Sequence, residues 1–205
     1  MKLRPIITRL RSDDGSVLVE FAIVTPLFLF LLFTLIDFTR LGYSKVLAEK
    51  ATQIAVRSAV VRPVACENVP TVTQRSLLGA LALDAPNGTP CNSRQNLCRP
   101  ANTVSCTGTL GNTTVADIWG RVKPLMPTGA QPENLRFTYS FDENLNRVGA
   151  PYAPMVTVEI ADLQFDFISP LGKLADLASG QSGSSLGQSF TFASMSASLP
   201  SEDLR

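Results

Sequence analysis

The longest apolar stretch of the chain lies close to its N-terminus, from Val17 to Ile36. It reads VLVEFAIVTPLFLFLLFTLI, and only four side chains, Glu20 and Pro26 among them, interrupt the run of hydrophobic residues. Twenty residues of α-helix rise roughly 30 Å, which matches the hydrocarbon core of a bilayer. The core helix of a soluble protein would keep a polar stripe, which this stretch lacks. The pattern therefore predicts a transmembrane helix surrounded by lipid.

Basic residues at positions 2, 4, 9 and 11 precede this stretch, so a cleavable secretory signal has to be considered. The apolar run is longer than the core of an ordinary signal peptide, and no small-x-small cleavage site follows it. The segment is therefore expected to stay as an anchor. Pro26 lacks a backbone donor and predicts a kink or a local loosening of the helix.

Helical sequence continues beyond the span as far as Val61, and Pro63 is the first proline after it. Small side chains recur there at intervals of mostly three or four, which permits the close approach of another element. That element is either the protein's own ectodomain or a neighbouring subunit. The residues of this stripe are Ser44, Ala48, Ala51, Ala55, Ser58 and Ala59.

The remaining residues, 63–205, predict a small α+β domain with an antiparallel sheet. Alternation over 135–141 and β-branched residues over 155–160 predict two strands of one hairpin, the second with an extension as far as Phe167. The aromatic face formed by Phe137, Tyr139 and Phe141 is expected in the core. A last strand is expected over 190–199, and the Gly/Ser-rich segment 179–189 is expected to be flexible.

Two helices are expected within this domain. Thr71 begins a sequence that resembles a capping box and predicts a short helix ending near Asp84. Thr113 or Thr114 can cap a second helix, which prolines at 124 and 127 would end.

Four cysteines, Cys66, Cys91, Cys98 and Cys106, all follow the span in a region rich in Asn, Thr, Pro and Gly. They lack the paired C-x2-4-C spacing of zinc sites, so two disulfides in an oxidising compartment are the preferred interpretation. Sequence leaves all three connectivities open. This use of cysteine places the N-terminus in the cytoplasm and the rest of the chain outside, whereas the distribution of Lys and Arg favours that orientation only slightly.

Composition narrows the classes of function. The 205 residues carry 18 Lys+Arg against 17 Asp+Glu, a net charge of +1, which argues against a broadly basic nucleic-acid binder. Histidine is absent, so the commonest general base and metal ligand is missing. No nucleotide-binding, serine-hydrolase, zinc-protease or calcium-loop motif occurs. We therefore expect no catalytic residue, no metal and no cofactor, and we expect that the protein is not an enzyme.

The junction before the span reads Gly15-Ser16-Val17-Leu18-Val19-Glu20-Phe21. A glycine followed by a hydrophobic helix with glutamate at the fifth position resembles the processing site of type IV prepilins. The resemblance implies cleavage by a prepilin peptidase between Gly15 and Ser16. It also implies that the new amino group at Ser16 pairs with Glu20 of a neighbouring subunit, a favourable contact at low dielectric.

The longer stretch 15–62 resembles the TadE-like pseudopilins of tight-adherence (Tad) systems. The features that carry the resemblance are Val19-Glu20-Phe21-Ala22, Pro26, Asp37-Phe38-Thr39-Arg40 and the alanine-rich helix after them. Phe21 replaces the tyrosine that usually follows this glutamate in major Flp pilins, which favours a minor pseudopilin. The resemblance assigns Glu20, Phe21 and Pro26 to assembly and register.

The resemblance implies three parts: a cytoplasmic basic leader at 1–15, a transmembrane and extended helix at 16–62, and a pilin-like periplasmic domain at 63–205. Implied partners are the prepilin peptidase, the Flp-type major pilin, other minor pseudopilins and the Tad assembly platform of the bacterial inner membrane. The protein would enter or prime the pilus, and would then be extracellular. The alternative is a permanently anchored periplasmic scaffold of the same machinery.

Overall fold

The computed structural model describes residues 16–77, 85–167, 189–202 and 204 of the chain. The chain divides into two compact units. The first contains the N-terminal part of the long helix, as far as Gly42, and the second contains residues 43–165 and 190–204. Each unit is described by itself. The expected flexible segment lies outside the described residues apart from Ser189.

A single helix, α2 (Ser16–Ala59), accounts for the apolar stretch and for its predicted continuation. Its 44 residues run through Pro26 without interruption. At 1.5 Å per residue the helix is about 66 Å long, roughly twice the thickness of a hydrocarbon core. The expected helix beyond the span is therefore confirmed.

Four strands form the main sheet of the second unit, and all neighbouring pairs are antiparallel. In spatial order they are β1 (Val104–Thr107), β2 (Leu135–Ser140), β3 (Met155–Ile160) and β6 (Met195–Pro200). A separate two-stranded sheet pairs β4 (Gln164–Phe165) with β5 (Phe190–Thr191). The described residues of this unit also form the helix α3 (Thr113–Val122) and the short 3-10 helices η3 (Cys91–Ser93), η4 (Lys123–Leu125) and η5 (Pro132–Asn134).

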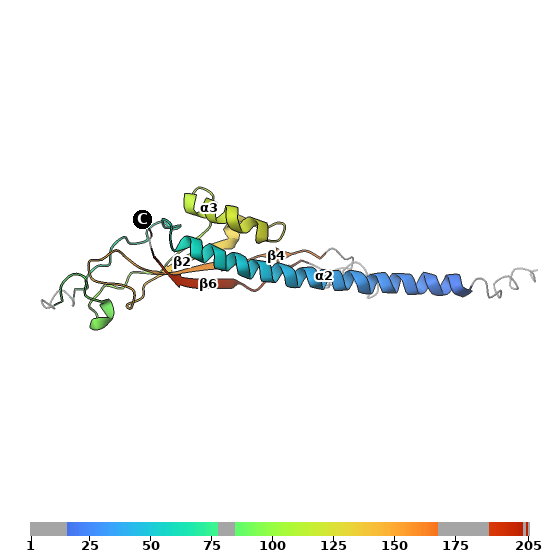
Figure 1. The fold of residues 1–205 in the computed structure, drawn as a ribbon, viewed down its shortest axis with the longest axis horizontal. Helices are drawn as coiled ribbons and strands as arrows, with labels where there is room; N and C mark the ends of the chain where they lie inside the picture. Colours follow the sequence, from blue (N-terminus) through green and yellow to red (C-terminus); the bar gives the residue numbers. More distant parts are fainter. Residues whose placement is uncertain (1–15, 78–84, 168–188, 203, 205) are drawn as a thin grey trace, which may run out of the picture. The chain divides into compact units, whose positions relative to one another are not determined.

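One face of the main sheet forms the core. Phe137 and Tyr139 of β2 are buried there, as the alternation predicts, and Phe141 is half-buried just beyond the strand. In Figure 1 the last turns of α2 run alongside this sheet. Ala48, Ala51, Ala55 and Ala59 of α2 are completely buried in the isolated chain. The small-residue stripe therefore packs on the protein's own second unit.

The opposite face of the sheet is polar. Register places Ser105, Thr138, Thr157 and Ser198 in one row across all four strands. The Ser105 and Thr138 hydroxyl oxygens lie 2.9 Å apart, and those of Thr157 and Ser198 lie 2.7 Å apart. Such cross-strand hydroxyl pairs stabilise a solvated face.

The two disulfides are Cys66–Cys106 and Cys91–Cys98. The pairing is nested, with the shorter loop inside the longer one. Cys66–Cys106 ties the segment after α2 to the edge strand β1, while Cys91–Cys98 closes a loop of its own.

The expected caps of two helices need correction. Residues 71–77 contain no helix, because their backbone groups pair with distant segments: Thr73 N donates to Ala150 O and Ser76 N to Leu97 O. The rest of the first expected helix, as far as residue 84, lies outside the described residues. The Thr73 hydroxyl donates to Asn146 Oδ1 rather than serving a helix N-terminus. For α3 the cap is Asn112, whose Oδ1 accepts from the N–H groups of Thr114 and Val115.

The strand boundaries also differ from expectation. β3 ends at Ile160, because Asp162 adopts a positive φ of 56° and the chain turns before β4. The expected last strand divides into β5 and β6, which belong to different sheets. β1 was not expected, because it lies within the polar cysteine-containing loop.

Candidate functional site

The candidate processing site lies at the N-terminal end of α2. The described part of α2 begins at Ser16, the residue on the carboxyl side of the expected cut. Gly15 and the rest of the basic leader lie outside the described residues. Cleavage between Gly15 and Ser16 stays a prediction.

Glu20 lies one helical turn after Ser16, and positions four apart share one face of a helix. The Glu20 side chain is exposed, and within residues 16–77, 85–167, 189–202 and 204 no ion pair involves it. A carboxylate inside a hydrocarbon core is costly, and an acidic group in such a segment usually has a partner. Its position leaves the carboxylate open to a group from outside the chain, and its role stays a prediction.

Phe21 and Pro26, the other two residues assigned to assembly, lie on the exposed surface of α2. Because Pro26 has no N–H, the carbonyl of Ala22 lacks its usual helical donor. No interaction among the described residues tests their assignment to register.

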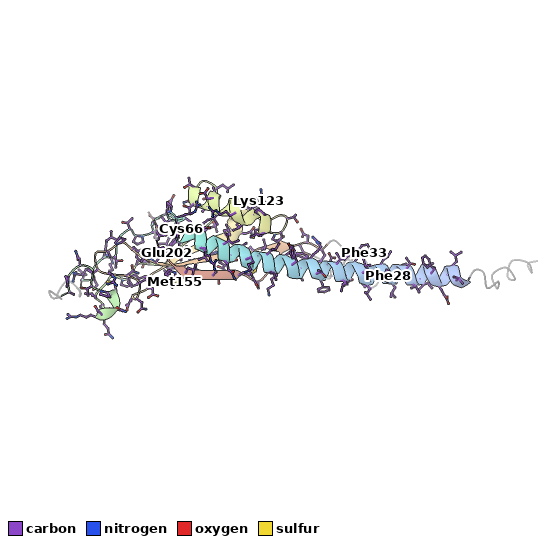
Figure 2. The ribbon with its side chains drawn as sticks, viewed as in Figure 1. Phe28, Phe33, Cys66, Lys123, Met155 and Glu202 are labelled. Carbon is purple, nitrogen blue, oxygen red and sulfur yellow. A yellow bond between two sulfur atoms is a disulfide. The ribbon has the colours of Figure 1, made fainter. Side chains whose placement is uncertain are left out.

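The surface of α2 around these residues is hydrophobic. Phe28 and Phe33 are 58% and 45% exposed, and Figure 2 shows both side chains standing out from the helix. None of the most apolar 18-residue window is buried against the protein. The polar side chain of Thr34 is satisfied locally, because its hydroxyl donates to Phe30 O at 2.8 Å. Among the described residues, α2 is the one helix long and apolar enough to cross a membrane, as a membrane-anchored protein requires.

A partly buried ion pair follows the apolar stretch. Arg40 Nη1 lies 3.2 Å from Asp37 Oδ1, and the Asp37 side chain is 1% exposed. The two residues are three positions apart, so the helix brings them together. Asp37 and Arg40 are the first and last residues of the D-F-T-R sequence. Their ion pair joins two side chains on successive turns of α2.

The described residues do not assemble a reaction centre from these side chains. Within the part of the chain that the structure describes, no group of three or more His, Cys, Asp or Glu side chains is placed to hold a metal ion. Glu20, Phe21 and Pro26 instead belong to one continuous helical surface. What this surface offers is contact with lipid or with another apolar helix.

The fold combines a helix that fits a membrane anchor with an α+β domain that contains two disulfides. Residues 15–57 match the family model described as TadE-like protein. The chain therefore carries a TadE-like domain over these residues. No curated protein and no solved structure shows a significant match.

Proposed function

We propose that this protein is a minor pseudopilin of a Tad/Flp-type pilus, with a structural rather than an enzymatic role. The observation that carries the proposal is the TadE-like match, which begins at Gly15 and covers Glu20, the apolar stretch and the Asp37–Arg40 pair. One segment thus combines a processing sequence, a membrane anchor and a helix surface suited to assembly.

The proposed mechanism begins with the precursor held in the inner membrane by residues 17–36. Prepilin peptidase then removes the leader and leaves an amino group at Ser16. A carboxylate at the centre of a span costs about 2.5–3.5 kcal/mol on insertion scales, and less near an end. Pairing Glu20 with the Ser16 amine of a neighbouring subunit offsets this cost and sets the register of the two helices.

The assembly step moves the apolar surface of α2 from lipid into a helical bundle with the Flp-type major pilin and other minor pseudopilins. The Tad inner-membrane platform is the proposed site of this transfer. The last turns of α2 move with the ectodomain, because their alanine stripe is buried against it and Cys66–Cys106 follows directly. A force on these turns is therefore transmitted to the sheet.

The test is the N-terminal residue of the protein recovered from cells with an active prepilin peptidase, measured by mass spectrometry. Wild type is expected to start at Ser16, and Gly15→Leu to keep its leader. The matched control is Gly42→Leu on α2, where an added Cβ meets nothing within 4 Å. This variant should be cleaved like wild type.

Sheared surface fibres then distinguish the two forms of the proposal. A pseudopilin that enters the filament appears in the sheared fraction in its processed form. An intact Met1 in wild-type cells, with the protein confined to membranes, contradicts the proposal and supports the permanently anchored scaffold.

A further inference from the structure

Tyr152 carries a buried hydroxyl that has no hydrogen-bond partner. The residue is 6% exposed, and its phenolic oxygen is the buried side-chain atom that stays unpaired among the described residues. The other buried tyrosine, Tyr139, accepts a hydrogen bond from Ala65 N at 2.9 Å. Buried polar groups nearly always have a partner, so an orphaned hydroxyl indicates a group that the isolated chain does not supply.

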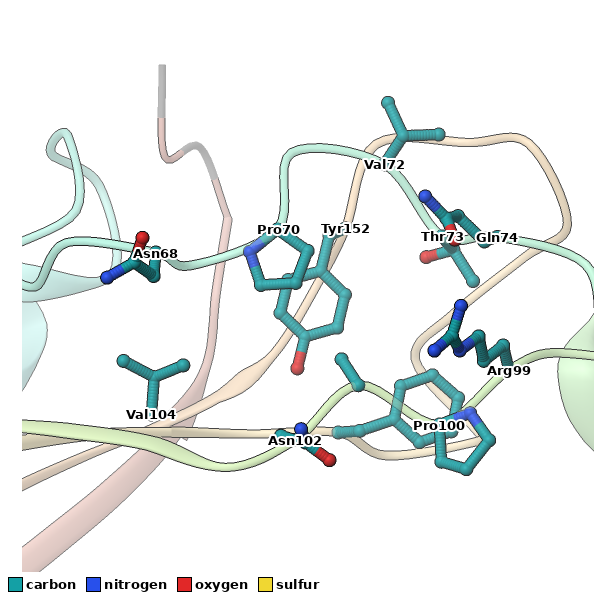
Figure 3. Close-up of a pocket in the computed structure, with 12 residues that line it drawn as sticks. Asn68, Pro70, Val72, Thr73, Gln74, Arg99, Pro100, Asn102, Val104 and Tyr152 are labelled. Carbon is teal, nitrogen blue, oxygen red and sulfur yellow. The ribbon is translucent and has the colours of Figure 1, made fainter.

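A hollow of about 250 Å³ lies beside this side chain within the second unit. Its polar lining includes Asn68, Gln74, Arg99 and Asn102, and its apolar lining includes Pro100 and Phe141. Figure 3 shows the Tyr152 ring standing in this hollow, with its hydroxyl directed toward the side on which Asn102 lies. The Tyr152 side chain therefore lines the hollow, while its phenolic oxygen is buried beneath the surface of the hollow.

Residues that line the hollow also contact one another. The Arg99 N–H donates to Gln74 O at 2.8 Å, and Arg99 directly follows the disulfide-bonded Cys98. The rings of Phe141 and Tyr152 are stacked, with centroids 6.3 Å apart and planes 4° apart. The hollow thus combines a fixed aromatic wall with exposed polar side chains.

We propose that this hollow binds a single neutral sugar ring, with the Tyr152 hydroxyl as one of its hydrogen-bond partners. Sugar hydroxyls both donate and accept, as do the amide side chains of Asn and Gln and a tyrosine hydroxyl. The C–H faces of a sugar ring are apolar and suit Phe141 and Pro100. The volume is below the usual range for drug-sized ligands, which restricts the occupant to a small molecule.

Other ligand classes fit this lining less well. A purely apolar ligand would leave the Tyr152 hydroxyl without a partner. An anion would find one cationic side chain, Arg99, among the residues that line the hollow. Burial raises the pKa of the Tyr152 hydroxyl above its ordinary value of 10.0, so the group keeps its proton and can donate at physiological pH.

Access to the hydroxyl requires a small rearrangement. The phenolic oxygen is covered in the isolated chain, whereas Asn68 and Asn102 at the rim are exposed. A sugar in the hollow reaches the oxygen when the side chains that cover it turn aside. The lining residues belong to the ectodomain, so the inference does not depend on cleavage or on entry into a filament.

The test uses the full chain in lipid nanodiscs free of sugar-based detergent. Saturation-transfer difference NMR is recorded with D-glucose, D-galactose, D-mannose and N-acetyl-D-glucosamine at millimolar concentration, and with D-glucuronate as an anionic probe. Transfer from at least one neutral sugar is expected, with its ring protons closest to the protein. Transfer from none of them, or from glucuronate alone, overturns the proposal.

The decisive variant is Tyr152→Phe, which removes the hydroxyl and keeps the ring. Loss of one hydrogen bond should weaken sugar binding by about tenfold. Tyr43→Phe is the matched control, because Tyr43 is 66% exposed on α2, and it should bind like wild type. Unchanged affinity in a folded Tyr152→Phe protein overturns the proposal and leaves the oxygen as the site of a buried water.

Discussion

The phenolic oxygen of Tyr139 accepts a hydrogen bond of 2.9 Å from the backbone N–H of Ala65, joining the centre of β2 to the segment that leaves α2. Ala65 stands next to Cys66, which is bonded to Cys106 on β1. The same few residues thus fasten the end of the long helix to two adjacent strands, once by a hydrogen bond and once by a covalent link.

Removing the Tyr139 hydroxyl should destabilise the ectodomain. Tyr139→Phe leaves the Ala65 N–H buried without its acceptor, and an unsatisfied buried donor costs about 1–3 kcal/mol. Tyr152→Phe is the matched comparison and should be neutral or stabilising, because the hydroxyl it removes has no partner. Urea unfolding of the full chain in nanodiscs measures both. An equal loss in the two variants would contradict the assignment of their hydrogen bonds.

The same tyrosine predicts a loss of stability at alkaline pH. Burial raises the pKa of Tyr139 above 10.0, an effect that the hydrogen bond from Ala65 partly offsets. Above about pH 10 the unfolded chain releases this proton while the folded chain retains it, so the free energy of unfolding falls as pH rises. Below that pH both states are protonated and the contribution is constant. Tyr139→Phe should flatten the alkaline part of a stability-versus-pH curve, and an unchanged slope would argue against it.

The two disulfides should differ in their contribution to stability. Cys66–Cys106 spans 40 residues and Cys91–Cys98 spans 7. The chain-entropy model assigns about 4 kcal/mol to the longer loop and about 2.4 kcal/mol to the shorter one. The double variant Cys66→Ser/Cys106→Ser should therefore unfold at lower denaturant than Cys91→Ser/Cys98→Ser. Peptide mapping without reduction checks the pairing, and a cross-linked Cys66–Cys91 peptide would refute it.

Gly108 should tolerate no side chain. A Cβ at this position would lie 2.5 Å from the carbonyl oxygen of Pro132, and the Gly108 N–H already donates to Leu135 O at 2.7 Å. Gly108→Ala forces the backbone apart and should cost about 1–3 kcal/mol. Gly111→Ala is the control, because an added Cβ there meets nothing within 4 Å. Thermal unfolding of the two variants should separate them clearly, with the control close to wild type.

Glu20 should matter for assembly and not for cleavage. Glu20→Ala is expected to yield a chain that starts at Ser16 but reaches the sheared pilus fraction at a level reduced by about tenfold or more, because the buried amine of a neighbour is left unpaired. The control is Glu49→Ala, an exposed glutamate farther along α2. Normal pilus formation by the Glu20 variant would refute the proposed pairing.

The local pattern of hydrophobic and polar residues was sufficient to predict several helices and strands. Continuous hydrophobicity and the lack of proline between 27 and 62 predict α2, since helix formation depends on neighbours three and four residues apart. Alternation predicts β2 and β3 and their hairpin, which the register confirms. The TadE-like segment was also recognisable, because its glycine, glutamate, proline and D-F-T-R residues all fall within one continuous stretch.

Long-range pairing decided the features that sequence could not. The residues at 71–77 have a helix-cap pattern, but their backbone bonds go to Leu97 and Ala150, partners that no local rule identifies. The small-residue stripe on α2 fits either of two surfaces by its spacing, and only the folded chain shows it packed on the chain's own second unit. Disulfide connectivity depends on which cysteines the fold brings together.

For the candidate sites too, some properties follow from the sequence and others only from the tertiary structure. Sequence alone determined that the chain has a long lipid-compatible helix with an acidic residue near its start, because hydrophobicity and charge are properties of the residues themselves. Only the tertiary structure decided that Tyr139 has a hydrogen-bond partner and Tyr152 has none. The residue type is the same at both positions, and the two differ because a distant backbone N–H, that of Ala65, reaches the hydroxyl of Tyr139 and no such group among the described residues reaches that of Tyr152.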